Sequence, residues 1–184
     1  MQYLKRFGFF ILTNLLVVTT IGIILKVFNV QPYMTAYGVN YTSLLIYCGI
    51  WGMAGSFISL LLSRFMAKMT MGMKPLDQND AEYGWVVQRV YQYAKVAGIS
   101  TMPEVCVYNS AEVNAFATGP TKNRSLVAVS TGLIQAMSRE EVEGVIAHEV
   151  AHIENGDMVT MTLIQGVVNA FALFLSKIIS MALS

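Results

Sequence analysis

The sequence predicts a mostly helical α+β membrane protein, in which a transmembrane hairpin precedes a water-facing domain with a small β-sheet. Hydrophobic residues make up 55% of the 184 residues and charged residues only 12%, about half the share in an average soluble domain. All 11 acidic residues lie between Asp77 and Asp157. The stretch before Asp77 is therefore membrane-like, and the acidic middle faces water.

This division predicts three segments. Residues 1–65 form the transmembrane hairpin, with spans at about 7–27 and 42–62. Residues 66–157 form the water-facing domain, and residues 158–184 form a third hydrophobic helix. Each hydrophobic segment approaches the length of about 20 residues that crosses a bilayer.

The first apolar run, Phe7 to Leu25, contains no charge and is preceded by Lys5 and Arg6. A signal peptide is the alternative interpretation, since a basic start also precedes an apolar run there. The run is long for a signal peptide, and no small-x-small cleavage pattern follows it. We therefore expect it to be retained as a membrane helix.

The second run, Tyr41 to Leu62, contains Gly49, Gly52 and Gly55 at intervals of three. Small residues at such spacing let another helix approach closely. Glycine is also simply common in membrane helices, and the sequence leaves both explanations open.

The third run, Met158 to Ser176, is uncharged but contains Thr162, Gln165 and Asn169 on one helical face. Polar side chains on one face predict packing against protein rather than lipid.

Basic residues predict the topology of the hairpin. Lys5 and Arg6 precede the first span, and Arg64, Lys68 and Lys74 follow the second. Positive residues stay on the cytoplasmic side of a membrane, so the water-facing domain is expected in the cytosol.

Within the water-facing domain, hydrophobic periodicity and turn residues predict two helices and three extended segments. The first helix is expected at Asn79–Ala97, and the extended segments at Glu104–Tyr108, Asn114–Ala117 and Ser125–Val129, the last two forming a hairpin. A capping box at Ser138 and Glu141 opens the second helix, which should end near Gly156.

The composition argues against two other classes of protein. No basic patch is interleaved with aromatic residues, so a nucleic-acid partner is not expected. The two cysteines, Cys48 and Cys106, lie in segments of different character and do not form a disulfide framework. A reducing compartment is therefore expected for the water-facing domain.

The only two histidines, His148 and His152, are four residues apart and enclose Glu149. Positions four apart share a helical face, so both imidazoles can point at one ion. Neutral imidazole suits Zn²⁺, and the intervening glutamate can activate water, which is the HExxH pattern. Random placement would give this arrangement roughly once in two thousand chains, so the motif is strong evidence for a metallopeptidase.

The helix around the motif supports this interpretation. Its apolar residues span one arc of roughly 140° at 100° per residue; they are Val142, Val145, Ile146, Val150 and Ile153. Glu149 falls inside that arc, where a carboxylate is costly without a partner. The alternative is a partly exposed, salt-bridged helix with two ordinary histidines.

Four segments resemble the HtpX family of bacterial membrane metalloproteases, which are relatives of the CAAX prenyl protease. They are the N-terminal hairpin, Asn114-Ala115-Phe116-Ala117-Thr118-Gly119, Val127-Ala128-Val129-Ser130-Thr131-Gly132-Leu133, and His148 to Asp157 with the helix that follows. The resemblance extends from the N-terminus to the last residue, and it implies a cytosolic zincin-like domain.

By this resemblance, His148 and His152 would be zinc ligands and Glu149 the general base. The segment Asn114, Ala115, Phe116 and Ala117 would be a strand edge that pairs with the substrate backbone; alternatively, Asn114 caps a turn and Phe116 packs in the core. Asp157 would either orient a ligand histidine or cap the third hydrophobic helix.

The chain departs from the family in one respect, because similar proteins continue past residue 184 with a fourth span and a glutamate that completes the zinc site. A catalytic zinc normally has three protein ligands. Candidates for the third within the chain are Glu112, Glu154, Asp157 and Cys106, none at a compelling spacing. We therefore expect this chain to be a fragment that is inactive alone.

The resulting hypothesis is a multi-pass zinc endopeptidase of the bacterial inner membrane. Its resemblance to the family implies a stress-response role in quality control, with misfolded or damaged membrane proteins as substrates. The alternatives are a catalytically inactive membrane protein that binds peptides, and a transporter or channel subunit, which leaves HExxH unexplained. The sequence predicts no particular oligomeric state.

Overall fold

The computed structural model describes residues 15, 19–30 and 32–183. The chain forms two compact units, which we call the helical unit (residues 1–59 and 161–184) and the sheet unit (residues 60–160). Most of the predicted first span, residues 7–14 and 16–18, lies outside the described residues; residues 19–27 are helical.

Two long helices pass through the helical unit, α2 (Tyr41–Met71) and α6 (Asp157–Ala182). Among the described residues, these are the helices long and apolar enough to cross a membrane. Only 22% and 6% of their most apolar windows are buried, so neither is the core helix of a soluble domain. Helix α2 extends beyond the predicted Leu62 because no helix breaker occurs before Gly72, whose φ of 62° ends it.

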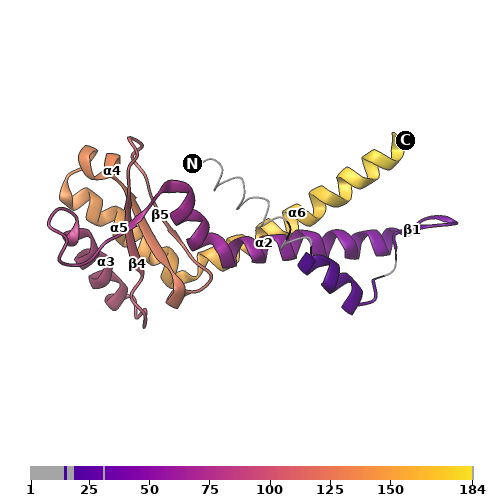
Figure 1. The fold of residues 1–184 in the computed structure, drawn as a ribbon, viewed down its shortest axis with the longest axis horizontal. Coiled ribbons are helices and arrows are strands. Elements are labelled where there is room, and N and C mark those ends of the chain that lie inside the picture. The colour runs from indigo at the N-terminus through magenta and orange to yellow at the C-terminus, as the bar shows by residue number, and fades with distance from the viewer. Residues whose placement is uncertain (1–14, 16–18, 31, 184) are drawn as a thin grey trace. The chain divides into compact units, whose positions relative to one another are not determined.

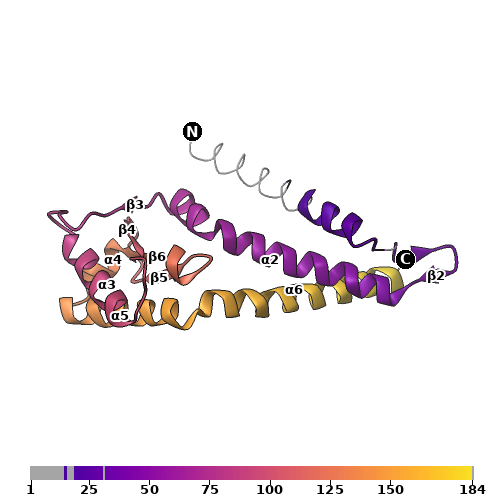
Figure 2. The same ribbon diagram turned by 90° about the horizontal axis from the view of Figure 1, so that it is seen from below.

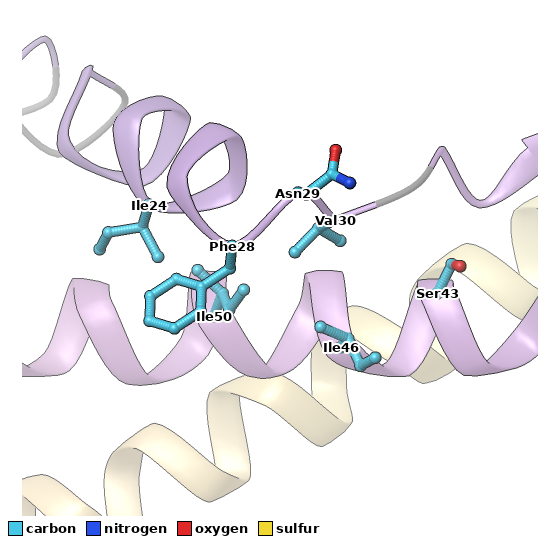
Figure 3. Close-up of a pocket in the computed structure, with 7 residues that line it drawn as sticks. All are labelled: Ile24, Phe28, Asn29, Val30, Ser43, Ile46 and Ile50. Carbon is cyan, nitrogen blue, oxygen red and sulfur yellow. The ribbon is translucent and has the colours of Figure 1, made fainter.

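A small hairpin that the sequence did not predict precedes α2. It consists of β1 (Met34–Thr35) and β2 (Gly38–Val39), which pair antiparallel. Residues 24–30 and the start of α2 line an open apolar pocket of about 460 Å³. In Figure 3, Ile24 and Phe28 point from the first segment toward Ile46 and Ile50 of α2.

Helices α2 and α6 approach closely at two glycines. A Cβ on Gly52 would lie 2.4 Å from the backbone nitrogen of Ala170, and one on Gly166 would lie 2.5 Å from the Met53 sulfur. A Cβ on Gly49 or Gly55 would meet nothing within 4 Å. The close approach of α6 therefore explains why position 52 is glycine, whereas Gly49 and Gly55 have no such contact.

The polar face of α6 packs partly against α2. Asn169 Nδ2 donates to Ser56 Oγ at 3.3 Å, and Gln165 Nε2 donates to Asn169 Oδ1 at 2.8 Å. The prediction that these side chains contact protein is confirmed for Asn169, with Gln165 as its partner.

The sheet unit contains a four-stranded sheet with the order β3-β4-β6-β5. Its strands are β3 (Lys74–Pro75), β4 (Glu104–Tyr108), β5 (Ala115–Thr118) and β6 (Leu126–Ser130). Strand β6 pairs parallel to β4 and antiparallel to β5, so the predicted hairpin is confirmed. The short 3-10 helix Lys122–Arg124 lies in its connection. Strand β5 is consequently an edge strand.

The central strand β6 is buried on both faces. Val127 and Val129 pack against α3 (Gly84–Val96) and α5 (Arg139–Asn155), whereas Leu126 and Ala128 pack on the opposite face with Met73. Figures 1 and 2 show α3 and α5 side by side on one face of the sheet. The short helix α4 (Thr131–Ala136) connects β6 to α5.

Local polar contacts set the helix ends in the sheet unit. Helix α3 begins five residues later than predicted, because Asp77 and Asp80 accept hydrogen bonds from the backbone N–H groups of Asn79, Glu82 and Tyr83 and so form turns. The capping box predicted for α5 is present, and Gly156 ends that helix with φ of 74°. Both ends of α5 are therefore confirmed.

A charge cluster ties the end of α2 to the sheet. Arg64 and Lys68 both form salt bridges with Glu104 at the start of β4. Burial raises the pKa of Glu104, but the hydrogen bonds and charges of Lys68 and Arg64 outweigh burial and lower the pKa below its usual 4.5.

Replacing Glu104 with glutamine is expected to destabilise the protein by about 1 kcal/mol near neutral pH. A carboxyl whose pKa is lowered by folding stabilises the fold above its ordinary pKa, and this contribution is lost as the pH falls through the folded-state value. The difference between wild type and Glu104→Gln should thus shrink as the pH falls below about 4.5 and vanish once the pH is below the lowered folded-state pKa. Thermal unfolding in detergent at several pH values measures the stability difference between the two proteins. A difference that persists in acid would contradict this account.

Candidate metal centre

Helix α5 is oriented by its apolar face. Val142, Ile146, Val150 and Ile153 are buried in the core beneath the sheet, as their spacing predicts. On the same side, Arg89 of α3 forms a salt bridge with Glu143 at 2.7 Å, which fixes α5 against α3. The histidines consequently flank the buried face and lie at its border with solvent, His148 exposed and His152 half-buried.

The two imidazoles converge as the four-residue spacing predicts. The Nε2 atoms of His148 and His152 are 3.0 Å apart, and the ring planes meet at 77°. Two nitrogens bound to one tetrahedral zinc at about 2.0–2.1 Å lie roughly 3.3 Å from each other. The pair therefore fits a shared zinc ion with little movement of either ring.

Asp157 contacts the outer nitrogen of one of these rings. Its Oδ2 lies 2.6 Å from His152 Nδ1. A carboxylate only accepts hydrogen bonds, so Nδ1 of a neutral His152 carries the proton and the lone pair is left on Nε2. Asp157 also stands in the first turn of α6, so both interpretations of this residue have a structural basis.

Replacing Asp157 with alanine is expected to weaken zinc binding about 10- to 100-fold, the usual cost of losing a carboxylate behind a ligand histidine. Competition with a chelating indicator would measure the affinity. The control is Glu140→Ala, which removes an exposed carboxylate at the other end of α5. Equal zinc affinity in the two variants would assign Asp157 to helix capping alone.

Glu149 has a protein partner that the sequence did not indicate. Its Oε2 accepts a hydrogen bond of 3.0 Å from the backbone N–H of Ala117 in the edge strand β5. Glu149 is half-buried among the apolar residues of α5, and this contact gives its carboxylate a hydrogen-bond partner. It also places the general-base candidate directly against the predicted substrate edge.

The edge strand β5 has an outward backbone edge that is partly available for pairing, because its Ala117 N–H is bonded to Glu149. Asn114 bonds toward β6, because its carbonyl accepts from the Ser130 N–H at 3.0 Å. Backbone groups alternate along an antiparallel strand, so those of Ala115 and Ala117 point away from β6. Phe116 packs against the sheet, with its ring 6.0 Å from that of Tyr108. The core role of Phe116 and an outward-facing edge therefore coexist.

Among residues 15, 19–30 and 32–183, no third ligand lies with the two histidines. Within the part of the chain that the structure describes, no group of three or more His, Cys, Asp or Glu side chains could hold a metal. Cys106 lies on the sheet face opposite α5, and burial raises the pKa of its thiol to about 11. Cys106 is therefore eliminated as a ligand of this site.

Comparisons with known proteins agree with this geometry. Residues 80–183 match the protein family described as "Peptidase family M48", and the chain belongs to this family. It is 53% identical over 189 residues to a protein named "Protease HtpX homolog" from Bacillus licheniformis, covering 98% of this chain and 64% of the relative. Proteins of the same name from two other bacteria are also similar. The one from Bacillus subtilis is 53% identical, over 95% of this chain and 61% of the relative. The one from Thiobacillus denitrificans is 52% identical, over 96% of this chain and 60% of the relative.

The chain thus spans 60–64% of the length of the curated relatives it matches. Among solved structures, it is similar to S. mikatae Ste24p, with a TM-score of 0.61 and 17% sequence identity over 95% of this chain and 39% of that one. At this identity the likeness concerns the fold. Together with the two exposed apolar helices, the family relationship identifies a membrane protein.

Proposed function

We propose that the protein expressed from its complete gene is a membrane zinc endopeptidase. The observation that supports this most directly is the pair of facing Nε2 atoms, 3.0 Å apart, with the Glu149 carboxylate on the same helical turn. His148 and His152 would hold the zinc, and Asp157 would keep the His152 ring in the orientation and tautomer that zinc requires.

Zinc, when bound, would polarise the scissile carbonyl and lower the pKa of a water molecule. Glu149 would take the proton of that water and deliver it to the leaving amine, the work of a general base and then a general acid. The Ala117 N–H holds the carboxylate at the edge strand, close to where a paired peptide would lie. The outward N–H and carbonyl of Ala115 and the outward carbonyl of Ala117 would pair with the substrate as an extra strand, since the Ala117 N–H is bonded to Glu149.

The basic residues support a location for the proposed reaction. Arg64, Lys68 and Lys74 follow the apolar part of α2, and positive residues remain on the cytoplasmic side. We infer that the metal centre faces the cytosol at the inner membrane. Misfolded or damaged membrane proteins are the proposed substrates, in a quality-control role.

The proposal is tested with the complete gene product purified in detergent. Fluorescein-labelled β-casein, an unfolded general protease substrate, should be cleaved by the zinc-loaded protein. Cleavage should stop with a chelator and return with added Zn²⁺. Cleavage that persists at full rate in excess chelator would refute a metallopeptidase. The family match favours this function over an inactive peptide-binding protein.

A further inference from the structure

The segment Ser130-Thr131-Gly132, which follows the buried strand β6, is not used by the chemistry proposed above. It also begins α4, whose N-cap is Ser130. Its three residues contact the loop 109–114, which leads from β4 into the edge strand β5. We call these three residues the STG turn.

Ser130 uses every hydrogen-bonding position of its hydroxyl, although it is fully buried. Its Oγ donates to the carbonyl of Glu112 at 2.6 Å and accepts from the N–H groups of Asn114 at 3.1 Å and Leu133 at 3.0 Å. The backbone N–H of Ser130 also donates to the Asn114 carbonyl. One serine therefore fixes the start of the edge strand and the start of the helix that leads to α5.

Thr131 and Gly132 hold the preceding part of the same loop. Thr131 Oγ1 accepts from the Ser110 N–H at 3.2 Å and lies 3.1 Å from the Ser110 carbonyl oxygen, to which it can donate. The Gly132 N–H donates to that same carbonyl at 2.8 Å. A Cβ on Gly132 would lie 2.5 Å from the Ala111 carbonyl oxygen, so only glycine permits this approach.

These contacts converge on β5, the edge strand that contacts the helix carrying His148 and His152. The loop 109–113 is exposed or half-buried and carries no apolar core residue, so hydrogen bonds rather than packing determine its path. The position of Asn114 then determines the positions of the outward amides of Ala115 and Ala117, the latter in contact with Glu149.

We propose that the STG turn is a positioning element for substrate, which sets the register of the edge strand β5 against the metal-binding helix α5. The inference rests on the proposed peptidase function. Ser130 and Thr131 act through the edge strand as positioning residues and do not touch the substrate. Loss of their contacts should weaken binding of an extended peptide and leave the chemical step intact.

The test uses Thr131→Val, which keeps the shape of the side chain and removes its hydrogen bonds to Ser110, and Ser130→Ala, which removes three contacts. Hydrogen exchange in the zinc-loaded complete gene product should rise about fivefold or more in residues 109–118, the factor for one neutral hydrogen bond. Exchange in residues 139–153 of α5 should not change. KM for labelled β-casein should rise about fivefold, with kcat within about twofold of wild type.

Ser138→Ala is the matched control, because it also removes a serine hydroxyl that caps a helix but has no contact with the loop or the edge strand. A KM increase in this control equal to that of Thr131→Val would overturn the proposal. So would unchanged exchange in residues 109–118 in Thr131→Val, the variant expected to fold in any case. Failure of wild type to cleave casein would refute the peptidase function instead, while the exchange result still decides whether the STG turn holds the strand.

Discussion

Replacing Glu149 with glutamine is expected to lower kcat for peptide cleavage about 10³-fold while zinc remains bound. Glutamine keeps the size of the side chain and can still accept the hydrogen bond of the Ala117 N–H. It cannot take a proton from water, so the loss falls on the chemical step. Zinc should stay because the proposed ligands are His148 and His152, and Glu149 is not among them.

The measurement pairs casein cleavage with zinc content by atomic absorption on the same preparations. Glu140→Gln is the control, since it makes the same chemical change at an exposed position in the first turn of α5. Undiminished cleavage by Glu149→Gln would remove Glu149 from the mechanism. Loss of zinc together with activity would make Glu149 a ligand and not a base.

Replacing Gly52 with alanine is expected to destabilise the helical unit by about 3 kcal/mol, at the upper end of the cost of overpacking. The new Cβ would lie 2.4 Å from the backbone nitrogen of Ala170 and 2.7 Å from the Gly166 carbonyl oxygen. Backbone atoms cannot move aside as a flexible side chain can, so α2 and α6 would have to separate. Their hydrogen bond between Asn169 and Ser56 would then be lost as well.

Gly49→Ala provides the matched control, one helical turn away in α2. Its Cβ would meet nothing within 4 Å, and alanine favours a helix over glycine by about 1 kcal/mol, so this variant should be as stable as wild type or more so. Thermal unfolding in detergent compares the two. Equal melting temperatures would show that the glycine contact does not hold the helices together.

The sequence predicted helix α5 well because its signals are local. The capping box at Ser138, the apolar spacing from Val142 to Ile153 and Gly156 each act within a few residues, and together they fix where α5 begins, ends and faces. The convergence of His148 and His152 follows from the same helical geometry. Strand β4 was predicted at its observed bounds for a similar reason.

Features that depend on the order of the sheet could not be predicted. The contact between Glu149 and Ala117 joins residues 32 positions apart and exists only because β5 is the edge strand. The hydroxyl of Ser130 reaches the loop before β5 only because β6 lies between β4 and β5. The predicted start of α3 was five residues too early, because the Asp77 and Asp80 side chains accept hydrogen bonds from backbone N–H groups and form turns there.

Zinc content of the complete gene product, in wild type and in the variants His148→Ala and His152→Ala, tests the shared metal site most directly. Wild type should contain one zinc ion per chain, and each single variant should lose it, because neither imidazole alone can replace the facing pair. Zinc retained at full occupancy in both single variants would contradict the assignment of this helix as the metal centre.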